Sequence, residues 1–257
     1  MALLEVVGIR RSFYGVTALA GIDVRVEAGT ITGLIGPNGA GKTTLFNIVT
    51  GLLPAAAGTV IFDGQDITGW RSDRITRRGL VRTFQIARGF PRLTVMENLL
   101  LYGTAQPGER LWHALVRFPR VRQREAELVE RAYGVAAKLR LTPVLNQPAS
   151  DISGGQKKLL ELGRALMTAP QLILLDEPVA GVNPTLADEL VHHLLSLRDE
   201  GFTLLVIEHN MNLVARLCNP VIVMSHGQTL AVGTFAEVAA NLQVQEAYMG
   251  RRTWASS

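Results

Sequence analysis

Residues 36–44 read Gly-Pro-Asn-Gly-Ala-Gly-Lys-Thr-Thr, a full match to the phosphate-binding pattern G-x-x-x-x-G-K-S/T. Glycines in such a loop let consecutive backbone N–H groups point at phosphate oxygens, and the start of a helix adds partial positive charge. An apolar run over 31–35 precedes the loop, and the sequence predicts a helix over 42–50 after it. We expect the Lys42 ammonium to reach the β and γ phosphates of a nucleotide and the Thr43 hydroxyl to bind Mg²⁺. The complete match disfavours the alternative, a glycine-rich turn without a ligand.

Two adjacent acids, Asp176 and Glu177, follow the apolar run 172–175. This order places both carboxylates at the C-terminal end of a buried strand, the end where the phosphate loop also lies. Successive side chains of an extended strand point in opposite directions, so the two acids can have different roles. We assign Asp176 to Mg²⁺ and Glu177 to the general base that activates water. Taken alone, the hexapeptide 172–177 would favour an ordinary loop after a core strand.

Two further polar residues follow apolar runs. His209 comes after the run 204–207, where an imidazole can bond the γ-phosphate and orient water. Gln85 ends the run 80–84, where its amide can contact Mg²⁺ or a metal-bound water and report the nucleotide state to the next segment. In isolation each residue would more often be incidental. Their positions along the chain favour a function in catalysis for both.

A second glycine-rich segment, Ser153-Gly154-Gly155-Gln156, opens a helix predicted to end at Met167. A hydroxyl, bare backbone N–H groups and a helix N-terminus form an anion site that needs no lysine. Such a site could not easily reach the phosphate held by the first loop of the same subunit. We therefore expect two subunits arranged head to tail, each completing the nucleotide site of the other.

The pattern of apolar residues predicts an α/β fold. Short strands over 3–7, 24–26 and 59–62 indicate an antiparallel β subdomain near the N-terminus. Continuous apolar runs without alternation indicate a mainly parallel central sheet, and they lie at 31–35, 172–175, 204–207 and 221–224. Helical spacing of Leu128, Ala132, Val135 and Leu139 indicates an inserted α-helical subdomain. We expect one domain over 1–257, with a nucleotide-binding core at 1–85 and 158–257 and the insert at 86–157.

Composition excludes several classes of protein. The 257 residues include one cysteine, Cys218, so an internal disulfide is impossible. The chain opens without the basic and apolar regions of a secretory signal, which favours a reducing cytoplasm. The uncharged stretch 43–62 contains Pro54 and two glycines and begins inside the phosphate loop, so we do not expect it to span a membrane. The net charge of +4 is too modest to indicate nucleic acid or lipid.

In this order, residues 36–44, Gln85, 152–156, 172–177 and His209 resemble the ATP-binding-cassette transporter ATPases across nearly the whole chain. The resemblance implies a P-loop NTPase, RecA-like core that binds ATP and Mg²⁺. It implies that Phe13, rather than Tyr14, stacks on adenine, with packing in the core as the alternative for either ring. Asn183 stands where most relatives have aspartate, which permits hydrogen bonding across a dimer. The expected ATP-binding residues are Phe13, Gly36, Asn38, Gly39, Gly41, Lys42, Thr43, Thr44, Ser153, Gly154, Gly155 and Gln156.

Segments 82–85, 94–99, 181–184, 208–211 and 247–250 are similar to the branched-chain amino acid importer ATPases. That subgroup implies a second ATPase subunit, identical or paralogous, and integral membrane permeases at the cytoplasmic face of the membrane. A solute-binding protein outside the cell would take part indirectly.

Two segments are candidates for contact with the membrane domain. We expect Arg88, Gly89 and Phe90 to line a docking groove for a permease helix. Residues 110–124 carry five arginines and no acid. This composition fits two alternatives equally well: contact with a permease or lipid headgroups, or a solvated basic face of a helix.

Three other functions remain as alternatives. Related ATPases energise urea or amide import or lipopolysaccharide export, and the sequence does not separate these solutes. Soluble remodelling ATPases that act on ribosomes or DNA usually carry two cassettes or long coiled-coil arms, and this sequence has neither, so we expect no nucleic-acid partner. A small-molecule phosphotransferase would have no use for the second anion loop at 152–156.

Overall fold

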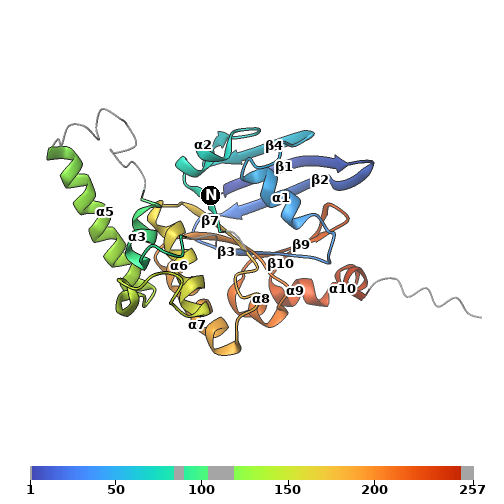
Figure 1. Cartoon of the computed structure of the whole chain (residues 1–257). Helices are drawn as coiled ribbons and strands as arrows, with labels where there is room; N and C mark the ends of the chain where they lie inside the picture. The colour runs from blue at the N-terminus through green and yellow to red at the C-terminus, as the bar shows by residue number, and fades with distance from the viewer. Residues whose placement is uncertain (1, 84–89, 104–118, 250–257) are drawn as a thin grey trace, which may run out of the picture. The chain divides into compact units, whose positions relative to one another are not determined.

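The computed structural model describes residues 2–83, 90–103 and 119–249 (Figure 1). The chain divides into two compact units, unit 1 with residues 1–82, 171–178 and 194–257, and unit 2 with residues 83–170 and 179–193. The sequence placed the corresponding boundaries after residues 85 and 157. The second glycine-rich segment and the helix that follows it therefore lie within unit 2.

Unit 1 contains the expected antiparallel sheet. Its strands are β1 (Ala2–Phe13), β2 (Val16–Glu27), β4 (Ala57–Phe62) and β5 (Gln65–Asp66), in the order β2-β1-β4-β5. Tyr14 and Gly15 form the turn between β1 and β2, both with positive φ, as a two-residue hairpin requires. The three strands that the sequence predicted here are confirmed, and all three are longer than expected.

A six-stranded sheet forms the centre of unit 1, in the order β10-β9-β3-β8-β7-β6. Its strands are β3 (Ile31–Ile35), β6 (Leu80–Arg82), β7 (Leu172–Asp176), β8 (Thr203–Ile207), β9 (Val221–Ser225) and β10 (Gln228–Gly233). All neighbouring pairs are parallel except β9 and β10. Every residue of β3, β7, β8 and β9 is buried, which explains why apolar residues fill most of these strands without alternation.

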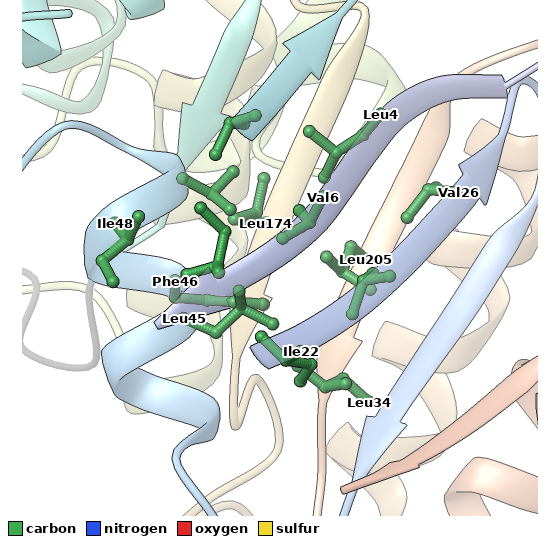
Figure 2. Packing of buried hydrophobic residues seen from close by; sticks show 14 of the residues in the cluster. Leu4, Val6, Ile22, Val26, Leu34, Leu45, Phe46, Ile48, Leu174 and Leu205 are labelled. Atoms are coloured by element: carbon green, nitrogen blue, oxygen red, sulfur yellow. The ribbon is translucent and has the colours of Figure 1, made fainter. Parts of the chain in front are cut away.

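The main core of unit 1 joins the two sheets through α1 (Lys42–Val49). Leu45 and Phe46 of this helix are fully buried against residues of both sheets (Figure 2). Leu4 and Val6 face the cluster from the antiparallel sheet, and Leu174 and Leu205 are members from the central sheet. This packing fixes the helix that begins at the phosphate loop.

Other helices complete the two units. Unit 1 has α2 (Ser72–Arg77), α8 (Met211–Leu217), α9 (Phe235–Ala240) and α10 (Leu242–Met249). Unit 2 is built from α3 (Val95–Leu100), α5 (Pro119–Lys138), the short 3₁₀ helix η2 (Thr142–Val144) and α6 (Gly154–Met167). Helix α7 (Pro184–Asp199) has residues in both units.

The helical character predicted for the insert is confirmed. Leu128, Ala132, Val135 and Leu139 are buried, and α5 packs on α3 and α6. In the described parts of the chain, no helix is both long enough and apolar enough to cross a membrane.

Candidate functional site

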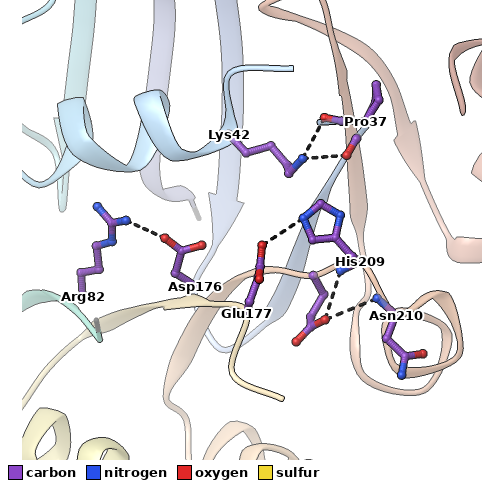
Figure 3. A network of polar contacts seen from close by, with 9 residues as sticks. Pro37, Lys42, Arg82, Asp176, Glu177, His209 and Asn210 are labelled. Atoms are coloured by element: carbon purple, nitrogen blue, oxygen red, sulfur yellow. Dashed lines mark hydrogen bonds and ion pairs between the residues drawn. The ribbon is translucent and has the colours of Figure 1, made fainter. Parts of the chain in front are cut away.

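The residues expected to handle a triphosphate gather at one edge of the central sheet. Lys42 follows β3, Asp176 ends β7, Glu177 comes next in the chain, and His209 follows β8 (Figure 3). Because β3, β8 and β7 are neighbouring parallel strands, their carboxyl ends meet at this edge. The structure therefore brings together four of the predicted site residues that lie far apart in the sequence.

The phosphate loop has a backbone that only glycine allows at two positions. Gly36 and Gly41 have φ values of 153° and 102°. A Cβ atom at Gly36 would lie 2.2 Å from the Met224 carbonyl oxygen, and one at Gly41 would lie 2.5 Å from that of Ala18. Gly41 is also the N-cap of α1 and makes no side-chain cap, so the first N–H groups of the helix are not capped by it. This is the arrangement that an anion at a helix N-terminus needs.

Lys42 is buried and turns back onto its own loop. Its Nζ donates to the carbonyl oxygens of Gly36 at 2.6 Å and Pro37 at 3.0 Å. Burial lowers the pKa of the Lys42 ammonium, while the nearby carboxylates of Glu177 and Asp176 act in the opposite direction. An ammonium has three N–H donors, so Lys42 can donate to a nucleotide phosphate, a charged acceptor, in addition to these two carbonyl oxygens.

Glu177 and His209 contact each other directly. His209 Nε2 lies 3.0 Å from Glu177 Oε1, and both side chains are partly exposed (Figure 3). Glu177 has a φ of 49°, a left-handed conformation that is uncommon for a residue other than glycine. Its N–H donates to the Ile207 carbonyl oxygen at 2.9 Å, so the backbone is held beside β8 despite this conformation. Strain of this kind concentrates at functional sites, where surrounding structure fixes it.

Glu208, for which no role was expected, directly precedes His209 and binds its backbone. Glu208 is 3% exposed, and its Oε2 accepts hydrogen bonds from the N–H groups of His209 at 3.1 Å and Asn210 at 3.4 Å. The buried carboxylate thus fixes the backbone that carries the histidine. An acid directly after the apolar run 204–207 was the available signal, because buried acids are rare unless they are bonded.

Arg82, the last residue of β6, is a second site neighbour for which no role was expected. Its Nη2 lies 2.6 Å from Asp176 Oδ2, and its Nη1 donates to Asn47 Oδ1 of α1 at 2.6 Å. Arginine in a strand that is otherwise apolar was a signal for a buried partner. The identity of that partner, 94 residues later, was not readable from the sequence.

The residues that the sequence assigned to a metal fit Mg²⁺ by their chemistry. Thr43 presents an exposed hydroxyl in the first turn of α1, and Asp176 supplies a carboxylate. Mg²⁺ is usually bound by one or two such oxygen ligands together with substrate phosphates and water. Within the described residues there is no cluster of three or more acids, histidines or cysteines that would hold a metal by itself. Gln85, the third expected metal contact, lies outside the described residues.

The second glycine-rich segment lies in unit 2 and opens α6 as expected. Ser153 and Gln156 form a capping box, in which the Ser153 Oγ accepts the Gln156 N–H at 3.2 Å. A Cβ at Gly155 would lie 2.7 Å from the Leu186 side chain, so close helix packing requires glycine there. Asn183 Oδ1 accepts the Leu186 N–H at 2.9 Å. Asparagine caps a helix as well as aspartate does, which explains the departure from the usual residue.

A cavity of about 610 Å³ lies over this segment of unit 2. Its lining combines glycines and polar side chains with one lysine and one glutamate. The lining residues are Ser153, Gly154, Gly155, Lys158, Gly181, Val182, Asn183, Thr185, Leu186 and Glu189. The cavity is therefore a concave surface at a helix N-terminus, suited to an anionic group.

The two candidate adenine-stacking rings differ in their surroundings. Phe13 is half-buried, and the Arg11 guanidinium lies 5.0 Å from the centre of its ring. Tyr14 is fully exposed in the left-handed turn of the β1–β2 hairpin. Adenine stacking by Phe13, rather than Tyr14, stays a prediction from the resemblance.

Phe90, the described residue of the expected docking groove, is 51% exposed. Buried Asn98 fixes its backbone from both sides, because Asn98 Oδ1 accepts the Phe90 N–H at 3.2 Å and Nδ2 donates to the Phe90 carbonyl at 3.0 Å. Arg88 and Gly89 lie outside the described residues, as does most of the arginine-rich segment 110–124. Of that segment Arg124 is described, and it pairs with Glu127 at 2.9 Å.

Comparison with known proteins identifies the family. The ABC transporter family matches residues 19–180, more than half of the chain. The chain is 40% identical over 254 residues to the probable branched-chain amino acid transport ATP-binding protein LivG of Methanocaldococcus jannaschii, covering 97% of this chain and 98% of that protein. It is 38% identical to the high-affinity branched-chain amino acid transport ATP-binding protein BraF of Pseudomonas aeruginosa, covering 96% and 98%.

Solved structures agree with this assignment. The crystal structure of an ATP-binding cassette of an ABC transporter in its ADP conformation is 39% identical, with a TM-score of 0.84 over 97% of this chain and 99% of that one. A nucleotide-free cassette is 38% identical, with a TM-score of 0.83 over 97% and 100%. The expected P-loop NTPase core with an antiparallel β subdomain and a helical insert is confirmed. The chain therefore belongs to the ABC transporter family, and it is an ATPase built on that family's ATP-binding cassette.

Proposed function

We propose that this chain is the ATP-hydrolysing subunit of a transporter that imports branched-chain or related amino acids, bound at the cytoplasmic face of the membrane. The contact between Glu177 and His209 beside the phosphate loop carries the catalytic part of this proposal. The names of the relatives that match nearly the whole chain carry the choice of solute. Import of urea or amides and export of lipopolysaccharide remain the rival assignments.

The proposed reaction is in-line attack of water on the γ-phosphate of ATP. Lys42 donates an N–H to the phosphates in addition to its contacts with the carbonyls of Gly36 and Pro37, while the N-terminus of α1 binds the same phosphate group. Glu177 takes the proton from the attacking water, and His209 fixes the carboxylate that receives it. Mg²⁺, held by Thr43 and Asp176, would neutralise charge on the β and γ phosphates.

We propose that a second ATPase subunit, identical or paralogous, completes the site. The cavity at Ser153 and Gly155 has the chemistry to bind a γ-phosphate presented by the partner's phosphate loop. Asn183 caps α7 with its side-chain oxygen, which leaves its amide hydrogens for a contact across the dimer. Replacing Ser153 with Ala should lower turnover at saturating ATP and leave binding of ADP to the separate subunit unchanged. Unchanged turnover in that variant would contradict the shared site.

We propose that Phe90 docks a helix of the membrane permease. The Phe90 side chain is half-exposed. Because the Asn98 side chain binds both the N–H and the carbonyl of Phe90, this exposure is a property of the folded unit 2. Replacing Phe90 with Glu should abolish transport in the assembled complex and leave ATP binding by the free subunit within about twofold of wild type. Tyr133 on α5 is a matched control, since it is 54% exposed and belongs to the same unit. Equal transport by the Phe90→Glu and Tyr133→Glu complexes would argue against this docking site.

The solute can be tested by reconstitution. The chain would be purified with the permeases and the solute-binding protein encoded beside its gene and placed in proteoliposomes. Leucine, isoleucine or valine with the binding protein should stimulate ATP hydrolysis and accumulate in the vesicles, and the Glu177→Gln complex should show neither effect. Stimulation by urea or an amide instead, or the absence of a binding-protein gene, would assign the ATPase to a rival transporter.

A further inference from the structure

A charged pair is buried beside the phosphate loop. The side chains of Arg82 and Asp176 are 9% and 6% exposed, and the distance between Nη2 and Oδ2 is 2.6 Å. In Figure 3 the guanidinium reaches Asp176 from the side opposite Glu177 and His209. A buried ion pair is weak evidence for stability, because apolar side chains of similar volume often stabilise a protein as well or better. Its position next to the proposed metal ligand suggests a role in function.

The same guanidinium also contacts α1. Nη1 donates to Asn47 Oδ1 at 2.6 Å, and the guanidinium carbon lies 5.5 Å from the centre of the Phe46 ring. Asn47 and Phe46 belong to the helix that begins with Lys42 and Thr43. Arg82 therefore joins the strand that ends in Asp176 to the helix that carries the phosphate-binding side chains, with one arm of a rigid, planar fork on each.

We propose that Arg82 is a positioning residue for the Mg²⁺ site, an inference that depends on the proposed role of Asp176. The guanidinium anchors Asp176 through Oδ2, and its other oxygen, Oδ1, is outside this ion pair and is the oxygen offered to the metal or to a metal-bound water. A cation beside a metal ligand weakens the attraction of that ligand for a second cation. Arg82 must therefore act by fixing geometry, as hydrogen-bond partners of metal ligands commonly do.

The test measures metal dependence of nucleotide binding rather than turnover. A fluorescent β,γ-imido analogue of ATP would be titrated into the full-length subunit, once with EDTA and once with excess Mg²⁺. The ratio of the two dissociation constants is the Mg²⁺ enhancement. For Arg82→Met we expect this enhancement to fall by about 10- to 100-fold, the usual effect of removing a partner of a metal ligand. Binding in EDTA should stay within about threefold of wild type, and a wild-type enhancement would overturn the inference.

Two milder variants keep the test decisive if Arg82→Met does not fold, which a thermal melt would reveal. Arg82→Lys keeps the charge but has one donor group in place of a fork, and Asn47→Ala removes the α1 arm while retaining the ion pair. Each should lower the Mg²⁺ enhancement by severalfold. Wild-type enhancement in both variants would overturn the positioning role.

Asp176→Asn separates this inference from the proposed function. That variant should lose the Mg²⁺ enhancement, since it lacks the charged ligand itself. If it retains the enhancement, the metal assignment of Asp176 is wrong and the role of Arg82 falls with it. If Asp176→Asn loses the enhancement while the Arg82 and Asn47 variants keep it, the inference about Arg82 alone is wrong.

Discussion

Replacing Glu177 with Gln tests the proposed general base most directly. The two side chains have nearly the same shape, and the amide oxygen of Gln can still accept a hydrogen bond from His209 Nε2 across the 3.0 Å contact. The amide cannot take a proton from water, so the variant should lose base catalysis while keeping the local geometry. Removing a general base typically slows a reaction by about 100- to 10,000-fold. This corresponds to about 3–5 kcal/mol of transition-state stabilisation.

The assay combines phosphate release with nucleotide binding. Turnover of Glu177→Gln at saturating ATP should fall by the stated factor, while the dissociation constant for ATP stays within about threefold of wild type, because Lys42 and the loop are unchanged. Since ATP is bound but not cleaved, size-exclusion chromatography with ATP and Mg²⁺ should show a dimer that wild type does not accumulate. Glu246→Gln on α10 is a control, because it changes an exposed acid on another element.

The double variant with His209→Ala adds a second criterion. If His209 acts only through Glu177, its removal should slow the wild-type enzyme but have little further effect on Glu177→Gln, since residues that work as a unit are not additive. Turnover of Glu177→Gln above one tenth of wild type would refute the assignment of the base. Fully additive losses would refute the coupling between the two residues.

Three further predictions concern the phosphate loop, the ring that stacks on the adenine base, and the buried thiol of Cys218. Gly39→Ala places a side chain at a φ of 81° with no atom within 4 Å, so it should lower the free energy of unfolding by about 1–2 kcal/mol. Gly41→Ala adds a clash with a carbonyl oxygen at 2.5 Å and should lower it by a further 1–3 kcal/mol or so, about the usual cost of overpacking. Urea titrations without nucleotide measure both. Phe13→Ala should weaken fluorescent ADP binding about tenfold and Tyr14→Ala should weaken it less; the reverse order would contradict the stacking role predicted for Phe13. Burial and Glu208 raise the pKa of the Cys218 thiol to about 12, so a disulfide reagent at pH 8 should react only after unfolding, and rapid reaction of the native protein would contradict this burial.

The parts of the fold that the sequence predicted are those governed by local pattern. Residues 31–35 and 204–207 read as buried strands because apolar side chains dominate them without alternation, and the structure buries every residue of both. Strand β10 alternates weakly in burial and gave no comparable signal. The subdomain boundary was also hard to place, because Gly155 contacts Leu186 through packing between segments distant in the chain.

The site was predictable where a chemical function needs a fixed spacing. Gly36, Lys42 and Asp176 follow from motifs whose spacing reflects contact with phosphate or metal. Arg82 and Glu208 follow from no such pattern, because each acts on a neighbour that the fold supplies, one through Asp176 and the other through backbone N–H groups. The residues predicted to touch the nucleotide thus come from sequence motifs, while the contacts that Arg82 and Glu208 make with their neighbours come from the structure.

In the proposed mechanism the three central side chains of the site can bind their new partners without losing the contacts that they already make. Lys42 uses two N–H donors on carbonyl oxygens, so its third N–H can reach a phosphate, which is a charged acceptor. Asp176 need not give up Arg82, because its ion pair uses Oδ2 and Oδ1 is outside it. Glu177 can keep His209 through Oε1 while its second oxygen takes the proton of water. The proposed binding of ATP therefore adds contacts to the lysine and to both acids while the folded chain keeps all three side chains in place.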